Sequence, residues 1–453
     1  MKRNIERKWF CFLIFSLLLT PLILIMLTSC GNESSGDSGN NGNSEESEEI
    51  ETNNVPESTE FFPDVYDEAI ETTPAPTLID KIFLSADGTR YCIAGKGEEG
   101  ARITVRGALK PNDETKVIDG QFILEVSIEK PSQDIDVQVY AQSSGKNESE
   151  PLTVTIEKSE RREDKPLCIG KNNHIHFRDT LNDYLGADLF SDTDLTRMQD
   201  GAEQLQRKLQ DEGLKTKVII FIAPNHGTIY PETMPSFLDE HKVSDDSKLQ
   251  QMTRQFSSSS VKFITPYDRL MKEKENYFIY NRTDTHWNEL GAYFGYCELF
   301  NYISETFPAA KPHPMSDFDI RNEIVRGGDL IPMLPFNQDE YIENAPVVRI
   351  KNPVAIDRTS DEIPYQESWF HEFREYDSKD TSKPNILMYR DSFSISMMSY
   401  IAETSNKITF NSMWDYNIDV NYVKKINPDF LIIERVERDL GGLQGVLRER
   451  NFK

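Results

Sequence analysis

The feature that most constrains the fold is an alternation, over residues 164–453, of short apolar runs with longer amphipathic stretches. The apolar runs have the character of buried strands and lie at residues 218–223, 261–265, 385–389, 408–410 and 430–433. The amphipathic stretches lie at residues 195–214, 289–307 and 422–426, and Asp194 is the expected N-cap of the first. This alternation predicts an α/β domain with a doubly wound, mostly parallel sheet, whose site lies at the carboxyl ends of the strands. The polar segment at residues 311–383 fits neither element, and we interpret it as a lid or a substrate groove.

Two short motifs supply the residue types of a nucleophilic triad. Asp284-Thr285-His286 places a carboxylate two residues before an imidazole, so in an extended segment both side chains would leave the same face. Ser392 follows the apolar run at residues 385–389 and precedes a helical pattern at residues 394–401. It is therefore expected on a strand-to-helix turn, where a helix N-terminus can stabilise an oxyanion. The pattern indicates an Asp-His-Ser triad and acyl-transfer chemistry.

Six segments, taken in order along the chain, resemble one known family. In single letters they are GKNNH at 170–174, APNHGTIYPE at 223–232, DTHWNELGA at 284–292, GDL at 328–330, DSFS at 391–394, and PDFLI at 428–432 with ER at 437–438. They are similar to the SGNH-like domain of the alginate O-acetylation proteins, the AlgX and AlgJ group, and to the related DHHW proteins of Gram-positive bacteria.

The resemblance implies an SGNH hydrolase-like fold and an O-acetyltransferase. Ser392 would be the nucleophile that carries acetyl as an acyl-enzyme, His286 the general base and Asp284 its orienting acid. The acceptor would be a hydroxyl of a cell-surface or extracellular polysaccharide, and a multipass membrane O-acyltransferase would supply the acetyl group. No cofactor is implied. Two alternatives stay open, a carbohydrate esterase and a polysaccharide- or partner-binding lipoprotein with an inactive triad.

Departures from the family pattern leave the substrate open. Arg390 stands where the family has Gly, His174 stands where it has Trp, and His226 falls beside the usual Lys. Arg390 either binds an anionic sugar or an oxyanion, or forms an ion pair with Asp391 or a nearby Glu. The full set of substrate and oxyanion candidates is Arg390, Asp391, Trp287, Tyr230, His226 and Asn411.

Aromatic and charged residues near the motifs have a structural reading beside the functional one. Tyr230, Trp287, Tyr293 and Trp414 are either sugar-stacking residues or core aromatics, with Trp287 the strongest candidate because it adjoins His286. Glu434, Glu437 and Arg438 either line the cleft or form a salt-bridged cap.

The N-terminus predicts export. Basic residues at positions 2–8 precede an apolar stretch at residues 9–26, and residues 27–31 resemble a bacterial lipobox. We therefore interpret residues 1–30 as a lipoprotein signal peptide with Cys30 as the lipid attachment site; an uncleaved signal anchor is the alternative. Either one places the chain at the extracellular face of the cytoplasmic membrane. Residues 31–76, rich in Gly, Ser, Asn, Glu and Pro, are predicted to be a disordered acidic linker.

Residues 77–158 contain short alternating runs separated by turn sequences such as Asp119-Gly120. This spacing predicts a small all-β sandwich, and its turns resemble a bacterial Ig-like module. Such a module is a spacer or a carbohydrate binder, and the scarcity of aromatic residues favours a spacer.

Charge and cysteine content exclude several classes of function. The net charge of −26 and a pI of about 4.8 disfavour nucleic acid and anionic lipid as ligands, and favour a neutral or amino-sugar polymer over a polyuronate. Cys92, Cys168 and Cys297 show no paired spacing, so no disulfide framework is predicted. His174 and His176 lack a third ligand at a zinc-like spacing, so no metal is predicted.

Overall fold

A computed structural model describes residues 70–108, 110–111, 115–158, 162–334, 337–359, 373–412, 417–448 and 452. The predicted signal peptide with Cys30, the predicted linker up to residue 69, and Trp414 lie outside these residues. Within the described part, no helix combines the length and the apolar character needed to cross a membrane. The described residues belong to one compact unit, residues 68–453.

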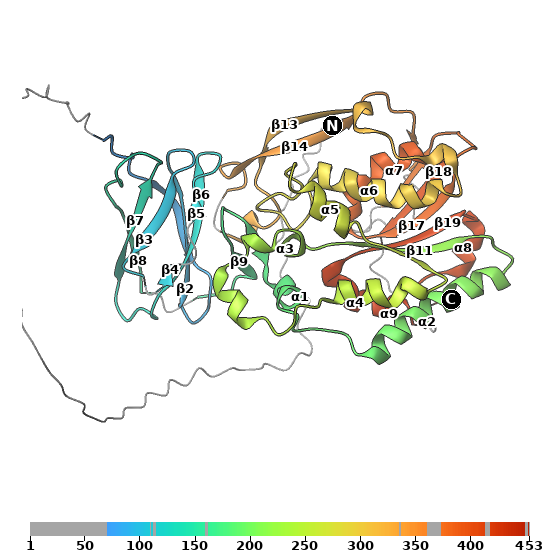
Figure 1. Ribbon diagram of the computed structural model, residues 1–453, viewed down its shortest axis with the longest axis horizontal. Coiled ribbons are helices and arrows are strands. Elements are labelled where there is room, and N and C mark those ends of the chain that lie inside the picture. The colour runs from blue at the N-terminus through green and yellow to red at the C-terminus, as the bar shows by residue number, and fades with distance from the viewer. Residues whose placement is uncertain are drawn as a thin grey trace, which may run out of the picture. The chain divides into compact units, whose positions relative to one another are not determined.

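Two antiparallel sheets pack face to face in the N-terminal part of this unit (Figure 1). Their strand orders are β1-β2-β6-β4 and β5-β3-β7-β8. The strands are β1 Thr77–Phe83, β2 Arg90–Lys96, β3 Arg102–Arg106, β4 Lys110–Pro111, β5 Thr115–Lys116, β6 Gln121–Ser127, β7 Ile135–Gln142 and β8 Leu152–Ile156. Ile93 and Phe122 of one sheet meet Ile103 and Val139 of the other in a buried cluster. The predicted small all-β fold is confirmed.

A seven-stranded sheet forms the centre of the C-terminal part, in the order β12-β11-β19-β17-β18-β16-β15. The first five strands in this order are parallel; at one edge β16 pairs antiparallel with β18, and β15 pairs antiparallel with β16. The strands are β11 Lys217–Ala223, β12 Lys262–Ile264, β15 Ile356–Asp357, β16 Arg374–Asp377, β17 Asn385–Arg390, β18 Lys407–Ser412 and β19 Phe430–Val436. The predicted mostly parallel sheet is confirmed.

Helices cover both faces of this sheet (Figure 1). One face packs against α5 Tyr267–Glu273, α6 Glu289–Ser304 and α7 Met398–Thr404. The other packs against α2 Asp192–Asp211, α4 Lys248–Gln255, α8 Val420–Ile426 and α9 Leu440–Val446. Neighbouring side chains of β11 alternate between the faces: Phe221 belongs to the first cluster, and Ile220 and Ile222 to the second. The sheet is therefore doubly wound.

The start of α2 differs from the sequence prediction. The hydroxyl of Ser191, not the carboxylate of Asp194, caps the helix, because it accepts the backbone N–H of Asp194. Asp194 lies in the first helical turn, where its negative charge interacts favourably with the positive end of the helix dipole. At α6 the side chain of Asn288 accepts the N–H groups of Leu290 and Gly291, which fixes where the helix begins after the His286 segment.

The interpretation of residues 311–383 as outside regular structure is wrong for their described part. β13 Phe318–Arg326 and β14 Ile342–Ile350 form a long antiparallel hairpin, and β15 and β16 extend the main sheet. Charged residues on the exposed face of β13, such as Arg321 and Glu323, hide the strand pattern in the sequence.

The β-sandwich packs directly against the α/β part, which the spacer interpretation did not anticipate. A short hairpin of β9 Leu167–Ile169 and β10 Ile175–Phe177, followed by α1 Leu181–Leu185, lies between the two parts in sequence. The buried Glu125 of β6 binds Arg90 at 2.6 Å and accepts the N–H of Ile169 at 3.1 Å. One apolar cluster contains Ile123 of the sandwich together with Ile169 and Leu330. The sandwich is part of the unit that carries the site.

Candidate active site

The Asp284-Thr285-His286 segment forms a tight turn just before α6. Asp284 Oδ1 accepts the backbone N–H of His286 at 2.8 Å and lies 2.7 Å from His286 Nδ1. The carboxylate therefore orients the imidazole, as expected. The local geometry is a bend rather than the extended segment predicted, because the aspartate side chain folds back onto the chain two residues ahead.

Ser392 lies on a strand-to-helix turn, directly after β17. The residue before it, Asp391, caps the 3₁₀ turn Ser392–Met397 by accepting the N–H of Phe393 at 2.8 Å. Its other carboxylate oxygen accepts the N–H of Val436 from β19 at 2.7 Å. Asp391 therefore fixes the turn rather than contacting substrate, and α7 follows where a helix was predicted from residue 394.

These two segments bring three predicted residues together. Ser392 Oγ lies 2.8 Å from His286 Nε2, and the opposite ring nitrogen is the one that Asp284 binds. The side chains of His286 and Asp284 are 25% and 20% exposed, so the group is reachable from solvent. This is the geometry in which an imidazole can take the proton of a serine hydroxyl.

The charges of the site favour an ionised aspartate and a basic histidine. Burial alone would raise the pKa of Asp284, but the hydrogen bonds and charge of His286 lower it to about 2. Burial alone would lower the pKa of His286, but the hydrogen bond and charge of Asp284 raise it above its usual value. An ionised Asp284 can therefore stabilise the imidazolium that forms during proton transfer.

Asp329, which was not among the predicted site residues, lies against the same turn. It accepts the N–H and the hydroxyl of Thr285, and its Oδ2 lies 3.4 Å from His286 Nδ1. Burial and the charge of Asp284 raise the pKa of Asp329 to about 6. The only signal in the sequence was the Gly-Asp-Leu segment at residues 328–330, whose contact with the turn depends on the fold.

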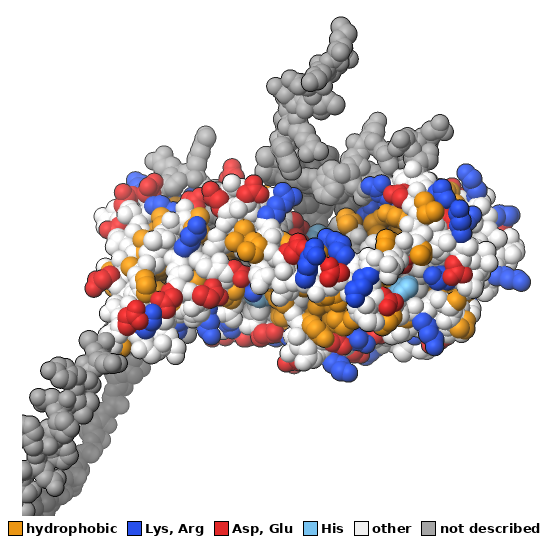
Figure 2. Space-filling view, turned by 90° about the horizontal axis from the view of Figure 1, so that it is seen from above, with side chains coloured by type: hydrophobic (Ala, Val, Ile, Leu, Met, Phe, Trp, Pro, Cys, Tyr) orange, Lys and Arg blue, Asp and Glu red, His pale blue; other side chains and the backbone are white. Residues whose placement is uncertain are grey.

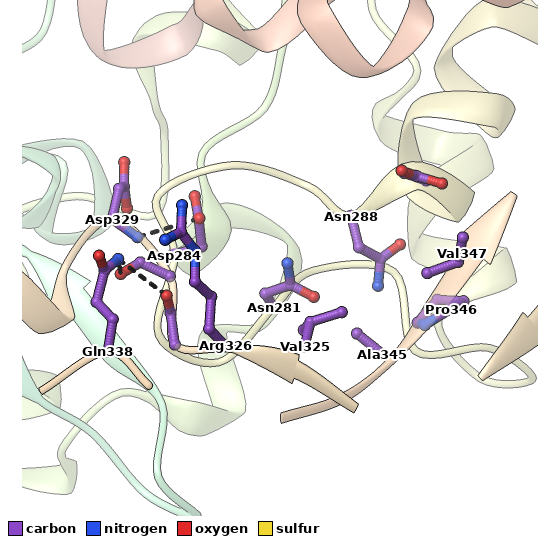
Figure 3. A pocket seen from close by; sticks show the side chains of 13 residues that line it. Asn281, Asp284, Asn288, Val325, Arg326, Asp329, Gln338, Ala345, Pro346 and Val347 are labelled. Carbon is purple, nitrogen blue, oxygen red and sulfur yellow. Dashed lines mark hydrogen bonds between the residues drawn. The ribbon is translucent and has the colours of Figure 1, made fainter. Parts of the chain in front are cut away.

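A cavity of about 360 Å³ opens beside Asp284 and Asp329 (Figure 3). The β13–β14 hairpin forms one wall, and Asn281, Gln338 and Arg326 add polar groups. In Figure 3 the side chain of Arg326 reaches toward the end of the cavity where the two aspartates lie. The hairpin residues of the segment predicted as a lid or groove thus line a cavity next to the triad.

Two of the aromatic candidates for sugar stacking are core residues. Trp287 is 2% exposed and donates its indole N–H to the carbonyl of Phe393 at 2.9 Å, so it ties the His286 segment to the Ser392 turn. Tyr293 is also buried, and its hydroxyl donates to the carbonyl of His313. The stacking interpretation is wrong for both, because neither ring face is open to a ligand.

Tyr230 and His226 are likewise buried and cannot contact a polymer. The Tyr230 hydroxyl accepts the N–H of Ile279, and His226 is the first residue of the short helix α3 His226–Ile229. His226 Nε2 lies 2.9 Å from His174 Nδ1, and the ring of His176 packs against the ring of His226. Burial lowers the pKa of His226 to about 4. His174, His176 and His226 form a neutral cluster. The sequence spacing paired only His174 with His176, and the fold brings His226 to them.

The remaining charged candidates are mostly internal. Arg390 is 3% exposed and donates to the carbonyl of Asp391 at 3.3 Å, so its burial argues against the predicted contact with an anionic sugar. Asn411 lies on β18, in register with Tyr389 of β17. Glu434 and Glu437 are fully buried and do not line a cleft. Figure 2 shows acidic and basic side chains interspersed over the face that it presents, without a basic stripe of the kind that binds nucleic acid.

Arg438 differs from these residues because it is only half-buried. Its guanidinium lies over the ring of Phe393, 5.2 Å from the ring centroid, and its charge opposes protonation of His286. Among Glu434, Glu437 and Arg438, Arg438 is therefore the residue whose charge acts on the triad histidine. Among the described residues, Asp284, His286 and Asp329 have side-chain atoms that converge as metal ligands would, but hydrogen bonds already connect this group, and we assign no metal to it.

Part of the chain matches the model of a known protein family. Residues 177–359 match the family model for the SGNH hydrolase-like domain of acetyltransferase AlgX, a range that includes Asp284 and His286 and ends before Ser392. No curated protein matches the sequence. The match confirms the family resemblance over three of the six motifs, those at residues 223–232, 284–292 and 328–330.

Solved structures with a similar chain course have low sequence identity. A DHHW family protein from Eubacterium siraeum is 12% identical over 70% of this chain and 95% of that chain, with a TM-score of 0.44. PatB1 from Bacillus cereus is 16% identical over 56% and 92%, with a TM-score of 0.44. AlgX from Pseudomonas aeruginosa is 15% identical over 62% and 67%, with a TM-score of 0.38.

Proposed function

We propose that this chain is an O-acetyltransferase that passes acetyl through Ser392 to a polysaccharide hydroxyl, because residues 177–359 match the family model of the SGNH hydrolase-like domain of acetyltransferase AlgX. The observation that carries the proposal is the continuous hydrogen-bonded path from Ser392 Oγ through His286 to Asp284. A serine hydroxyl becomes a strong nucleophile only when a base can take its proton, and this path supplies the base and orients it.

In the first half-reaction, Ser392 Oγ attacks the carbonyl carbon of an acetyl donor, and its proton moves to His286 Nε2. Asp284 stabilises the imidazolium through Nδ1. When the tetrahedral intermediate collapses, the bond to the donor's leaving group breaks, and that group takes the proton from Nε2. The product is acetyl-Ser392 and a neutral imidazole.

In the second half-reaction, His286 takes the proton of an acceptor hydroxyl, and the acceptor oxygen attacks acetyl-Ser392. The bond to Ser392 Oγ then breaks, and the serine takes the proton back. In both halves the negative charge on the acetyl oxygen needs a donor. The backbone N–H of Ser392, at the start of the 3₁₀ turn, is the donor we expect, with the half-buried Arg438, whose charge also acts on His286, as a nearby cation.

The geometry favours an enzyme over a protein that only binds polymer. A protein that only binds polymer does not need Ser392 within hydrogen-bond distance of a histidine that an aspartate orients. An esterase would use the same acyl-enzyme and differ only in that water replaces the sugar hydroxyl. The acceptor therefore has to be tested directly.

The acceptor test uses the chain from about residue 70 with a chromogenic acetyl ester, in the presence and absence of neutral and amino-sugar oligosaccharides. We expect acetylated oligosaccharide, detected by mass spectrometry, with wild type and not with Ser392→Ala. Ser399→Ala, a change at an exposed serine of α7, is the matched control and should act as wild type does. Ester cleavage without acetylated sugar would replace the transferase with an esterase, and no Ser392-dependent cleavage would leave only the binding function.

We further propose that the protein works outside the cytoplasmic membrane as a lipoprotein attached at Cys30, with a multipass membrane O-acyltransferase as its acetyl supplier. The basic and apolar N-terminal pattern and the lipobox-like residues 27–31 support the export step. Metabolic labelling of the full chain with a fatty acid should label the wild type and not Cys30→Ser. Equal labelling of both would rule out attachment at Cys30.

A further inference from the structure

The Asp-His-Ser mechanism leaves one carboxylate at the catalytic histidine unused. His286 Nδ1 lies 2.7 Å from Asp284 Oδ1 and also 3.4 Å from Asp329 Oδ2. The two aspartates lie 45 residues apart in the sequence, Asp284 in the turn before α6 and Asp329 in the segment after β13. One ring nitrogen therefore faces two carboxylates.

Asp329 also holds the residue between the two triad members. Its Oδ1 accepts the backbone N–H of Thr285 at 2.8 Å, and its Oδ2 accepts the Thr285 hydroxyl at 2.6 Å. In return, the backbone N–H of Asp329 donates to Asp284 Oδ2 at 3.2 Å. The carboxylate of Asp284 is thus held on one side by His286 and on the other by Asp329.

The chain around Asp329 is shaped for this close approach. The N–H of Gly328 donates to the Thr283 hydroxyl at 2.9 Å, and the N–H of Leu330 donates to the Thr283 carbonyl at 3.1 Å. A Cβ on Gly328 would lie 2.5 Å from Asp284 Cβ, which only glycine avoids. The buried side chain of Leu330 anchors the segment in an apolar cluster.

We propose that Asp329 is a positioning residue of the triad, which holds the Asp284–His286 turn through Thr285 and places a second negative charge beside Nδ1 of His286. The second charge stabilises the imidazolium form in each half-reaction, and so sets the pH at which His286 acts as a base. The expected effect on catalysis rests on the proposed acyl transfer, whereas the expected effect on the pKa of His286 does not.

The charges that face His286 and Asp329 are few enough to predict the sign of the effect. Asp284 and Asp329 favour the protonated histidine, and Arg438 opposes it. The charge of Asp284 raises the pKa of Asp329, and the charge of His286 lowers it. The side chain of Arg326 reaches toward the same end of the cavity (Figure 3). Because the pKa of Asp329 is raised to about 6, its charge is present at neutral pH and lost in mild acid.

The test compares Asp329→Asn, which keeps the shape and one acceptor oxygen for Thr285 but removes the charge, with Asp329→Ala, which removes both acceptors. Asp339→Asn, at an exposed aspartate ten residues further on, is the matched control. We would measure the pKa of the His286 ring by NMR titration, assigned with His286→Asn, and the pH profile of kcat/KM for a chromogenic acetyl ester.

We expect Asp329→Asn to lower the pKa of His286 by about one unit and to move the acidic limb of the profile to lower pH, while the control changes neither. Asp329→Ala should lower kcat further than Asp329→Asn, because Thr285 then loses both acceptors. A His286 pKa that is unchanged in Asp329→Asn, even with a lower melting temperature, would reduce Asp329 to a structural role and overturn the proposal. The NMR titration needs no turnover, so it separates failure of this inference from failure of the proposed function.

Discussion

Gly328→Ala should inactivate the site without changing any chemical group in it. The added Cβ would lie 2.5 Å from Asp284 Cβ and 2.5 Å from the Thr283 carbonyl oxygen, and neither atom is the flexible end of a side chain. Restoring ordinary contact requires the two segments to separate by about 1 Å. A misplacement of about 1 Å in a catalytic group costs on the order of 100-fold in rate, so we expect a loss of that size in kcat.

The assay is turnover of a chromogenic acetyl ester, with thermal unfolding measured on the same samples. Gly441→Ala is the matched control, because Gly441 lies in the helix α9 and its Cβ would meet nothing within 4 Å. That change should leave turnover as it is and favour the helix slightly. Folded Gly328→Ala protein with wild-type turnover would refute the claim that the Gly328 segment positions the triad.

Three further changes test other contacts. Trp287→Phe removes the indole hydrogen bond to Phe393 in a buried site and should lower the free energy of unfolding by about 2–3 kcal/mol in denaturant titrations; no change would contradict that contact. Burial lowers the folded-state pKa of His226 to about 4 from 6.5, so the unfolded chain binds the extra proton first and stability falls as pH drops from about 6.5 to 4, by up to about 3 kcal/mol. Between pH 7 and pH 5 the free energy of unfolding should therefore fall more in the wild type than in His226→Asn. Equal falls in the two proteins would contradict the lowered pKa of His226. Glu125→Gln should cost about 3 kcal/mol, because it weakens the ion pair of the buried Glu125 with Arg90 and its hydrogen bond from Ile169 of β9, whereas Glu148→Gln, at a surface ion pair, should cost much less; equal costs would count against a docked sandwich.

The central sheet could be predicted because its information is local. The three central parallel strands β11, β19 and β17 contain short apolar runs whose side chains are buried on both faces, as in residues 218–223 and 430–433. The nucleophile could be placed for the same reason, since Ser392 lies three residues after Tyr389, the last residue of such a run. Strand β13 was missed because a strand with an exposed, charged face has no apolar run to reveal it.

The remaining errors concern contacts between distant segments. Asp329, Trp287 and His226 have roles set by residues far along the chain, and no spacing in the sequence records such contacts. Docking of the sandwich depends on Asn173, which adopts a positive φ of 65° and hydrogen-bonds the backbone of β6 in place of a strand neighbour. The sequence around Asn173 carries no pattern that predicts this contact.

The acyl-enzyme itself is the most direct test of the account. The chain from about residue 70 would be mixed with a chromogenic acetyl ester, quenched in acid within the first turnovers, and examined by intact mass and peptide mapping. We predict one added acetyl group, on the peptide that contains Ser392, in the wild type and in Ser399→Ala but not in Ser392→Ala. Turnover without an adduct on that peptide, or an equal adduct in Ser392→Ala, would contradict it.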